Sequence, residues 1–164
     1  MSEILTQTAR AYCDRHRLRL AERLGFGIHG IVHVVEGNFK PGKAAIKIHS
    51  ANAPYQRERD VYLRLSQAGV RALLGFHVPQ LIRCDDELRV IEMSIVMRPF
   101  VLDFAGAYLD APPYFSDEIW AEWEAQKRDQ FDHRWPRVQA VLAALEELDI
   151  HMIDVSPSNV AFLD

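Results

Sequence analysis

Three glycines, Gly25, Gly27 and Gly30, follow one another in the spacing Gly-x-Gly-x-x-Gly near the start of the chain. Glycines at this spacing can bring backbone N–H groups against phosphate oxygens, because no side chain blocks the approach. With 8 glycines among 164 residues, the spacing arises by chance in roughly one such chain in fifty. The residues that follow therefore decide which phosphate-binding structure the glycines indicate.

The segment after the glycines favours a β-hairpin over the strand-to-helix turn of a dinucleotide-binding fold. Residues 31–35 are rich in β-branched side chains, which disfavour a helix. Turn residues follow at 37–42, and a second short apolar run over 44–48 includes Lys47. We therefore expect the glycines at the tip of a hairpin, with a lysine in the next strand. Such a loop can cover a nucleotide while the ammonium group reaches its phosphates.

The rest of the pattern predicts an α+β protein. Capping residues and helical periodicity predict four helices, which cover residues 3–19, begin at Pro54, follow Ser116 and begin near Pro136. Alternating apolar residues predict strands over 78–84, 88–97 and 160–163. We expect four parts in the chain, namely an N-terminal helix over 1–19, a sheet-containing unit over 20–97, a hinge over 98–101 and a helical unit over 102–164.

A second group of polar residues follows the last predicted helix. Asp154 and Asn159 stand in the spacing Asp-x-x-x-x-Asn, with Pro157 between them. The same residue types favour a capped turn, so this loop has both a structural and a catalytic interpretation.

Together these features resemble the protein kinase-like family, of the serine/threonine kinase type. The matching positions are the three glycines, Val32 at the end of the glycine loop, the strand lysine Lys47, the helix glutamate Glu58, and Asp154 and Asn159 of a catalytic loop. They occur in the family's order and cover roughly residues 20–164. The resemblance implies a kinase-like fold, in which an antiparallel sheet with a regulatory-type helix forms the N-lobe and a shortened helical unit forms the C-lobe.

The resemblance also implies a role for each position. The glycine loop, Val32 and Met97 would surround ATP, while Lys47 would contact its phosphates and Glu58 would hold Lys47 in place. Asp154 would accept the proton of an attacking hydroxyl group, and Asn159 would bind Mg²⁺. The structural alternatives are a solvent-exposed strand lysine at Lys47 and a surface glutamate at Glu58.

Two departures from the family limit the expected activity. The sequence ends at Asp164, before the point where the family carries its metal-binding Asp-Phe-Gly. Asp103-Phe104-Ala105-Gly106 has similar letters, but it precedes the catalytic loop, so we interpret it as a coincidence, and Asp164 is another carboxylate that could approach the metal. Ser156 stands where many members carry a lysine. The two candidate functions are therefore a phosphotransferase acting on an unidentified hydroxyl acceptor and a pseudokinase-like module that binds a nucleotide or a partner.

Charge and composition narrow the partners. A net charge of −4 gives no electrostatic case for nucleic acid, and no apolar run is long enough for a membrane span or a signal peptide, so we expect a cytoplasmic protein. Cys13 and Cys84 are isolated, which argues against a zinc site. Because the helical unit is short, we expect a second copy or a partner chain to cover part of it.

Overall fold

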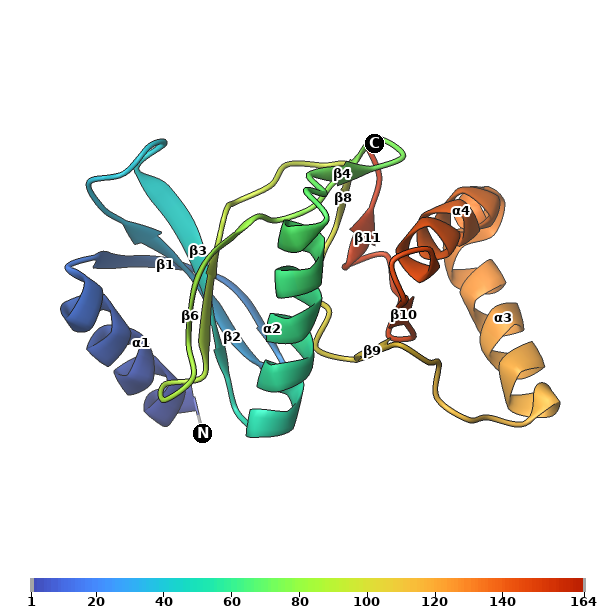
Figure 1. Cartoon of the computed structure of the whole chain (residues 1–164), viewed down its shortest axis with the longest axis horizontal. Coiled ribbons are helices and arrows are strands. Elements are labelled where there is room, and N and C mark those ends of the chain that lie inside the picture. The colour runs from blue at the N-terminus through green and yellow to red at the C-terminus, as the bar shows by residue number, and fades with distance from the viewer. Residues whose placement is uncertain (1, 164) are drawn as a thin grey trace.

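A five-stranded antiparallel sheet carries the glycine hairpin and Lys47 in the computed structural model, which describes residues 2–163 (Figure 1). Its strands, in spatial order, are β1 (Arg19–Gly27), β2 (Gly30–Glu36), β3 (Lys43–His49), β7 (Val90–Met93) and β6 (Leu81–Asp85). Gly27 pairs with Gly30, so the hairpin turn lies between them, as expected. Lys47 pairs with Val32 across β2 and β3. The α+β class with an antiparallel sheet is confirmed.

Two helices cover opposite faces of this sheet, α1 (Ser2–His16) and α2 (Asn52–Gln67). Side chains alternate between the two faces along a strand. In β3, Ile46 and Ile48 accordingly pack in the cluster that includes α1, whereas Ala45 packs in the cluster that includes α2. This alternation puts Lys47 on the α2 face of the sheet, where Glu58 lies.

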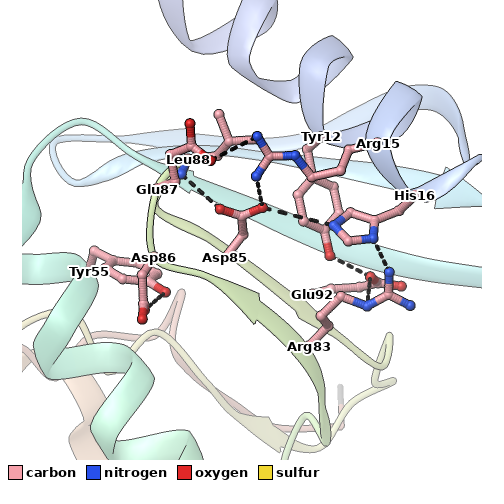
Figure 2. A network of polar contacts seen from close by, with 10 residues as sticks. All are labelled: Tyr12, Arg15, His16, Tyr55, Arg83, Asp85, Asp86, Glu87, Leu88 and Glu92. Carbon is pink, nitrogen blue, oxygen red and sulfur yellow. Dashed lines mark hydrogen bonds and ion pairs between the residues drawn. The ribbon is translucent and has the colours of Figure 1, made fainter.

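Polar contacts as well as apolar ones hold α1 against the sheet (Figure 2). The hydroxyl of Tyr12 donates to Glu92 Oε2 at 2.6 Å, and both residues are buried. One turn later, Arg15 donates to Asp85 Oδ2 at 2.7 Å. Burial, together with the hydrogen bond to the carboxylate, raises the pKa of Tyr12 above its ordinary 10.0. The helix is therefore fixed to β6 and β7 by side chains on its inner face.

The two remaining helices are α3 (Asp117–Phe131) and α4 (Trp135–Glu146), joined by a 3₁₀ turn over Asp132–Arg134. Ser116 caps α3 by accepting a hydrogen bond from the backbone N–H of Ile119 at 3.4 Å, and Pro136 stands in the first turn of α4. Both predicted helix starts are confirmed. No helix within residues 2–163 is long and apolar enough to cross a membrane.

Short strands bring distant parts of the chain together. A second sheet has the order β11 (Val160–Ala161), β8 (Phe100–Val101), β5 (Phe76–His77) and β4 (Ala72–Leu73). In addition, β9 (Ala107–Leu109) pairs with β10 (Ile150–Met152). The pattern of residues predicted only β11 among these. As a consequence, the segment before α3 lies beside the loop after α4.

Candidate functional site

Lys47 lies at the centre of a buried cluster of charges. Its Nζ is 2.7 Å from Glu58 Oε2 and 2.6 Å from Asp103 Oδ1, and the residue is only 6% exposed. Burial lowers the pKa of Lys47, but the two carboxylates outweigh this effect and raise it above its ordinary 10.5. The ion pair expected between Lys47 and Glu58 is present, and Lys47 is not a solvent-exposed strand lysine.

Glu58 is fully enclosed and has three partners. Besides Lys47, it accepts from His49 Nε2 at 2.7 Å through Oε2 and from the backbone N–H of Phe104 at 3.3 Å through Oε1. Burial raises the pKa of Glu58, but the charge of Lys47 and the contact with His49 outweigh burial, and the pKa falls from 4.5 to about 2. His49 Nδ1 also lies 3.2 Å from the carbonyl oxygen of Arg89.

Asp103 is a site residue that the sequence interpretation missed. From the sequence alone, Asp103 is interpreted as a coincidence of letters, because it precedes the catalytic loop in the chain. The structure places its carboxylate on Lys47, with the side chain 38% exposed. The only signal in the sequence was the likeness of residues 103–106 to Asp-Phe-Gly. Asp103 is positioned by the pairing of β8 with β11, and strands of two residues leave no periodic pattern in the sequence.

Residues 102–107, which we name the connecting segment, are held on one side by α2. The ring of Phe104 is fully buried and packs edge-to-face on Tyr62, with ring centroids 5.4 Å apart. Arg57 Nε donates to the carbonyl oxygen of Ala105 at 2.9 Å. The segment is thereby fixed to the same helix that supplies Glu58.

The connecting segment contacts the loop of Asp154 and Asn159 on its other side. The backbone N–H of Leu102 donates to the carbonyl oxygen of Asn159 at 2.9 Å. A Cβ atom added to Gly106 would lie 3.0 Å from Asp154 Cβ, which shows how closely the two backbones approach. The connecting segment therefore joins the Lys47 cluster to the loop that contains both predicted catalytic residues.

The loop over residues 153–159 combines both interpretations given by its sequence. Asn159 is buried, and its Nδ2 donates to the carbonyl oxygen of Asp154 at 2.6 Å while its Oδ1 accepts from the backbone N–H of Ser156 at 2.7 Å. The amide thus closes the turn, as the structural alternative requires. Asp154 itself is exposed. The exposed carboxylate of Asp154 therefore stands on a backbone that is held by Asn159 on one side and lies against Gly106 on the other.

A buried lysine on α3 is a second residue that the sequence gave no reason to select. Lys127 is 8% exposed, and its Nζ donates to Gln130 Oε1 at 3.3 Å. Burial lowers the pKa of Lys127 below its ordinary 10.5, and the charge of Asp154 only partly opposes this effect. One turn earlier on α3, Trp123 Nε1 donates to the carbonyl oxygen of Ile153 at 3.0 Å, so this face of the helix supports the loop.

The three glycines of the hairpin differ in what surrounds them. At Gly30, an added Cβ would lie 1.9 Å from the carbonyl oxygen of Ile48, so the packing of the hairpin on β3 requires glycine there. At Gly25 and Gly27 an added Cβ would meet nothing within 4 Å. The protein's own packing therefore does not explain these two glycines, and open space lies beside them.

The other predicted nucleotide contacts lie in different environments. Val32 is half-buried and faces Lys47 across the strand pair. Met97 is 80% exposed and lies in the irregular segment after β7. Asp164, which we considered as a metal ligand, lies outside the described residues.

Two surface hollows lie away from Lys47. One of about 350 Å³ is lined by Arg98, His133 and Arg134 beside Pro157, and one of about 490 Å³ lies between α3, α4 and β10. The ammonium group of Lys47 is covered by Asp103 and Glu58. A phosphate could therefore reach Lys47 only by sharing it with Asp103 or displacing Asp103.

No protein-family model matches this chain, and neither a curated protein nor a solved structure matches it.

Proposed function

We propose that this chain is an ATP-binding phosphotransferase with a protein kinase-like fold, which transfers phosphate to a hydroxyl acceptor. The observation that carries the proposal is the contact of Lys47 with Glu58 and Asp103 beside the glycine hairpin. A strand lysine held by a helix glutamate next to a glycine loop is the arrangement that such enzymes use to hold phosphates. Open space beside two of the three glycines supports the same function.

The position of Asp103 supports this proposal despite its unusual place in the chain. In the family, Asp-Phe-Gly follows the asparagine of the catalytic loop, whereas here Asp103-Phe104 precedes Asn159. Strand β8 pairs with β11, and β9 pairs with β10. Because the connecting segment lies between β8 and β9, these two pairs hold it beside the catalytic loop, although it comes before that loop in the sequence. We assign to Asp103 the metal-binding role that the sequence left open.

We assign Mg²⁺ to Asp103 and Asn159, whose segments are joined by a backbone hydrogen bond, in a site that the nucleotide would complete. Mg²⁺ is commonly held by one or two carboxylates together with phosphates and water. The nucleotide would have to supply ligands here, because no group of three or more His, Cys, Asp or Glu side chains within residues 2–163 could hold a metal ion. Asn159 would contribute the second lone pair of Oδ1, since the first accepts from Ser156. When bound, Mg²⁺ neutralises phosphate charge.

Asp154 is the residue that we assign as general base. Its carboxylate is exposed next to the connecting segment, so an acceptor hydroxyl group can approach it from solvent. The carboxylate would take the proton of that hydroxyl group as its oxygen attacks the γ-phosphorus of ATP. The bond from that phosphorus to the ADP oxygen would break, ADP would leave, and the carboxylate would release the proton to water.

A second candidate function is nucleotide binding without transfer. It is favoured by one observation, namely that both polar atoms of the Asn159 side chain are already used within its own loop. Such a protein would hold ATP against Lys47 without providing a complete metal site.

The test of the proposal compares ATP binding with and without Mg²⁺, by calorimetry, in the wild type and in Asp103→Asn. Because Asp103 neutralises Lys47, the wild type should bind ATP weakly without Mg²⁺ and at least ten-fold more tightly with it. Asp103→Asn should bind metal-free ATP more tightly than the wild type and lose the response to Mg²⁺. Asp110→Asn is the control, since Asp110 is exposed and pairs with Arg64 instead. Absence of ATP binding under every condition would overturn the proposal.

Transfer or release of the labelled phosphate of γ-labelled ATP, measured with the wild type and with Asp154→Ala, separates the two functions. Transfer or hydrolysis that Asp154→Ala abolishes supports the phosphotransferase. ATP binding without turnover supports the second candidate, and equal turnover in Asp154→Ala excludes Asp154 as the base.

A further inference from the structure

A groove of about 490 Å³ between α3, α4 and β10 contains all three tryptophans of the chain, Trp120, Trp123 and Trp135. The rings form a row of edge-to-face contacts, with centroids 5.8 Å apart for the first pair and 6.0 Å apart for the second. We name this feature the tryptophan groove. Its volume matches that of a small-molecule site.

The charged side chains of the tryptophan groove are acidic. Asp117, Glu124 and Glu146 line it, and no lysine or arginine does. Glu124 forms an ion pair with Arg128, whose Nη2 lies 3.1 Å from Glu124 Oε1. Asp117 and Glu146 form no ion pair with any of residues 2–163. An anion would therefore be repelled here, and a cation would be attracted by the carboxylates as well as by the electron-rich faces of the rings.

The tryptophan groove lies next to the candidate catalytic loop. His151, Met152 and Ile153 line it, and Asp154 follows directly. Trp123 also donates its ring N–H to Ile153 O, which ties the wall of the groove to that loop. A small molecule held among the tryptophans would therefore contact the residue that precedes Asp154 in the chain.

We infer that the tryptophan groove binds an ammonium or quaternary ammonium group, and that the acceptor is a small alcohol bearing such a group. The assignment as acceptor rests on the proposed function, whereas the cation site does not.

Because every tryptophan of the chain lines the groove, intrinsic fluorescence reports binding there directly. The probe is choline, and its control is 3,3-dimethylbutan-1-ol, which has the same shape without the charge. We expect a saturable change of emission with choline, no ATP being present, and binding weaker by roughly ten-fold or more for the neutral alcohol. Glu146→Gln should weaken choline binding by roughly two- to five-fold. Glu147→Gln, an equally exposed change at the next position that does not line the groove, should leave it unaltered.

Three results would overturn the cation site, and a fourth would overturn the assignment of the acceptor alone. Equal affinity for choline and the neutral alcohol would show that the groove is not a cation site. The lack of any change of emission with choline would show the same. A change of emission that depends on protein concentration, with a dimer seen by light scattering, would show that a second copy covers the groove. Saturable choline binding that never stimulates ADP release in the presence of ATP and Mg²⁺ would overturn the assignment of the acceptor while the cation site stands.

Discussion

Glu58 shows at the scale of one residue how burial and charge are balanced in this site. The carboxylate is out of reach of water, and its charge is tolerated because Lys47, His49 and the N–H of Phe104 surround it. The pKa of Glu58 is about 2 in the folded protein, against an ordinary 4.5. The folded state therefore binds this proton less tightly than the unfolded state does.

The stability of the protein should consequently fall in acid through Glu58. The ionised carboxylate stabilises the fold fully above pH 4.5, and this contribution is lost as the pH falls from 4.5 towards 2. In that window the free energy of unfolding should lose about 1 kcal/mol per pH unit from this group alone. Urea denaturation of the wild type and of Glu58→Gln at several pH values measures the difference. Glu122→Gln, an exposed change on α3, should keep the wild-type slope, and an unchanged slope in Glu58→Gln would refute the argument.

At the scale of the element, the docking of α1 depends on a single buried hydrogen bond more than on its exposed ion pairs. Glu92 is buried, and its nearest partner other than Tyr12 is the guanidinium of Arg83, at 3.8 Å. The ion pair of Arg15 with Glu87 is largely exposed and contributes little (Figure 2). Loss of the Tyr12 hydroxyl would leave Glu92 without its closest donor.

Tyr12→Phe should therefore lower the free energy of unfolding by about 1–3 kcal/mol, which is the cost of an unsatisfied buried acceptor. The amides of α1 should exchange faster than in the wild type, since the helix is held less tightly. Denaturation and hydrogen exchange measure both effects. Tyr114→Phe, at a position that is 99% exposed, should change neither. Identical stability of Tyr12→Phe and the wild type would show that apolar packing alone holds α1.

How well each element could be predicted depends on its length. Helices α2, α3 and α4 span several turns, so periodicity and caps such as Ser116 revealed them. Strands of two residues, such as β8, have no period to detect, and their pairing depends on contacts with distant segments. The family resemblance implied the contact of Lys47 with Glu58, whereas the contact of Lys47 with Asp103 required the fold.

In the molecule as a whole, the sheet-containing unit over residues 20–97 and the helical unit after it, which we call the two halves, share one hydrophobic cluster. It contains Tyr62 of α2, Val141 of α4 and Val160 of β11, with Phe104 of the connecting segment among them. The connecting segment also bonds to both halves through its backbone. Neither half can therefore lose its packing without exposing apolar surface of the other, and the protein should unfold in a single cooperative transition.

Phe104→Ala tests this coupling, because the ring is fully buried between the two halves. The change should cost about 3–5 kcal/mol of unfolding free energy, as expected for a large cavity. If the halves unfold together, native-state hydrogen exchange should show the same loss of protection for amides in β3 and in β10. Phe26→Ala, at a hairpin position that is 65% exposed, should leave both strands protected as before. Protection lost in only one of the two strands would show that the halves unfold separately. The connecting segment would then be a flexible joint, and the distance between Asp103 and the loop of Asp154 would vary with it.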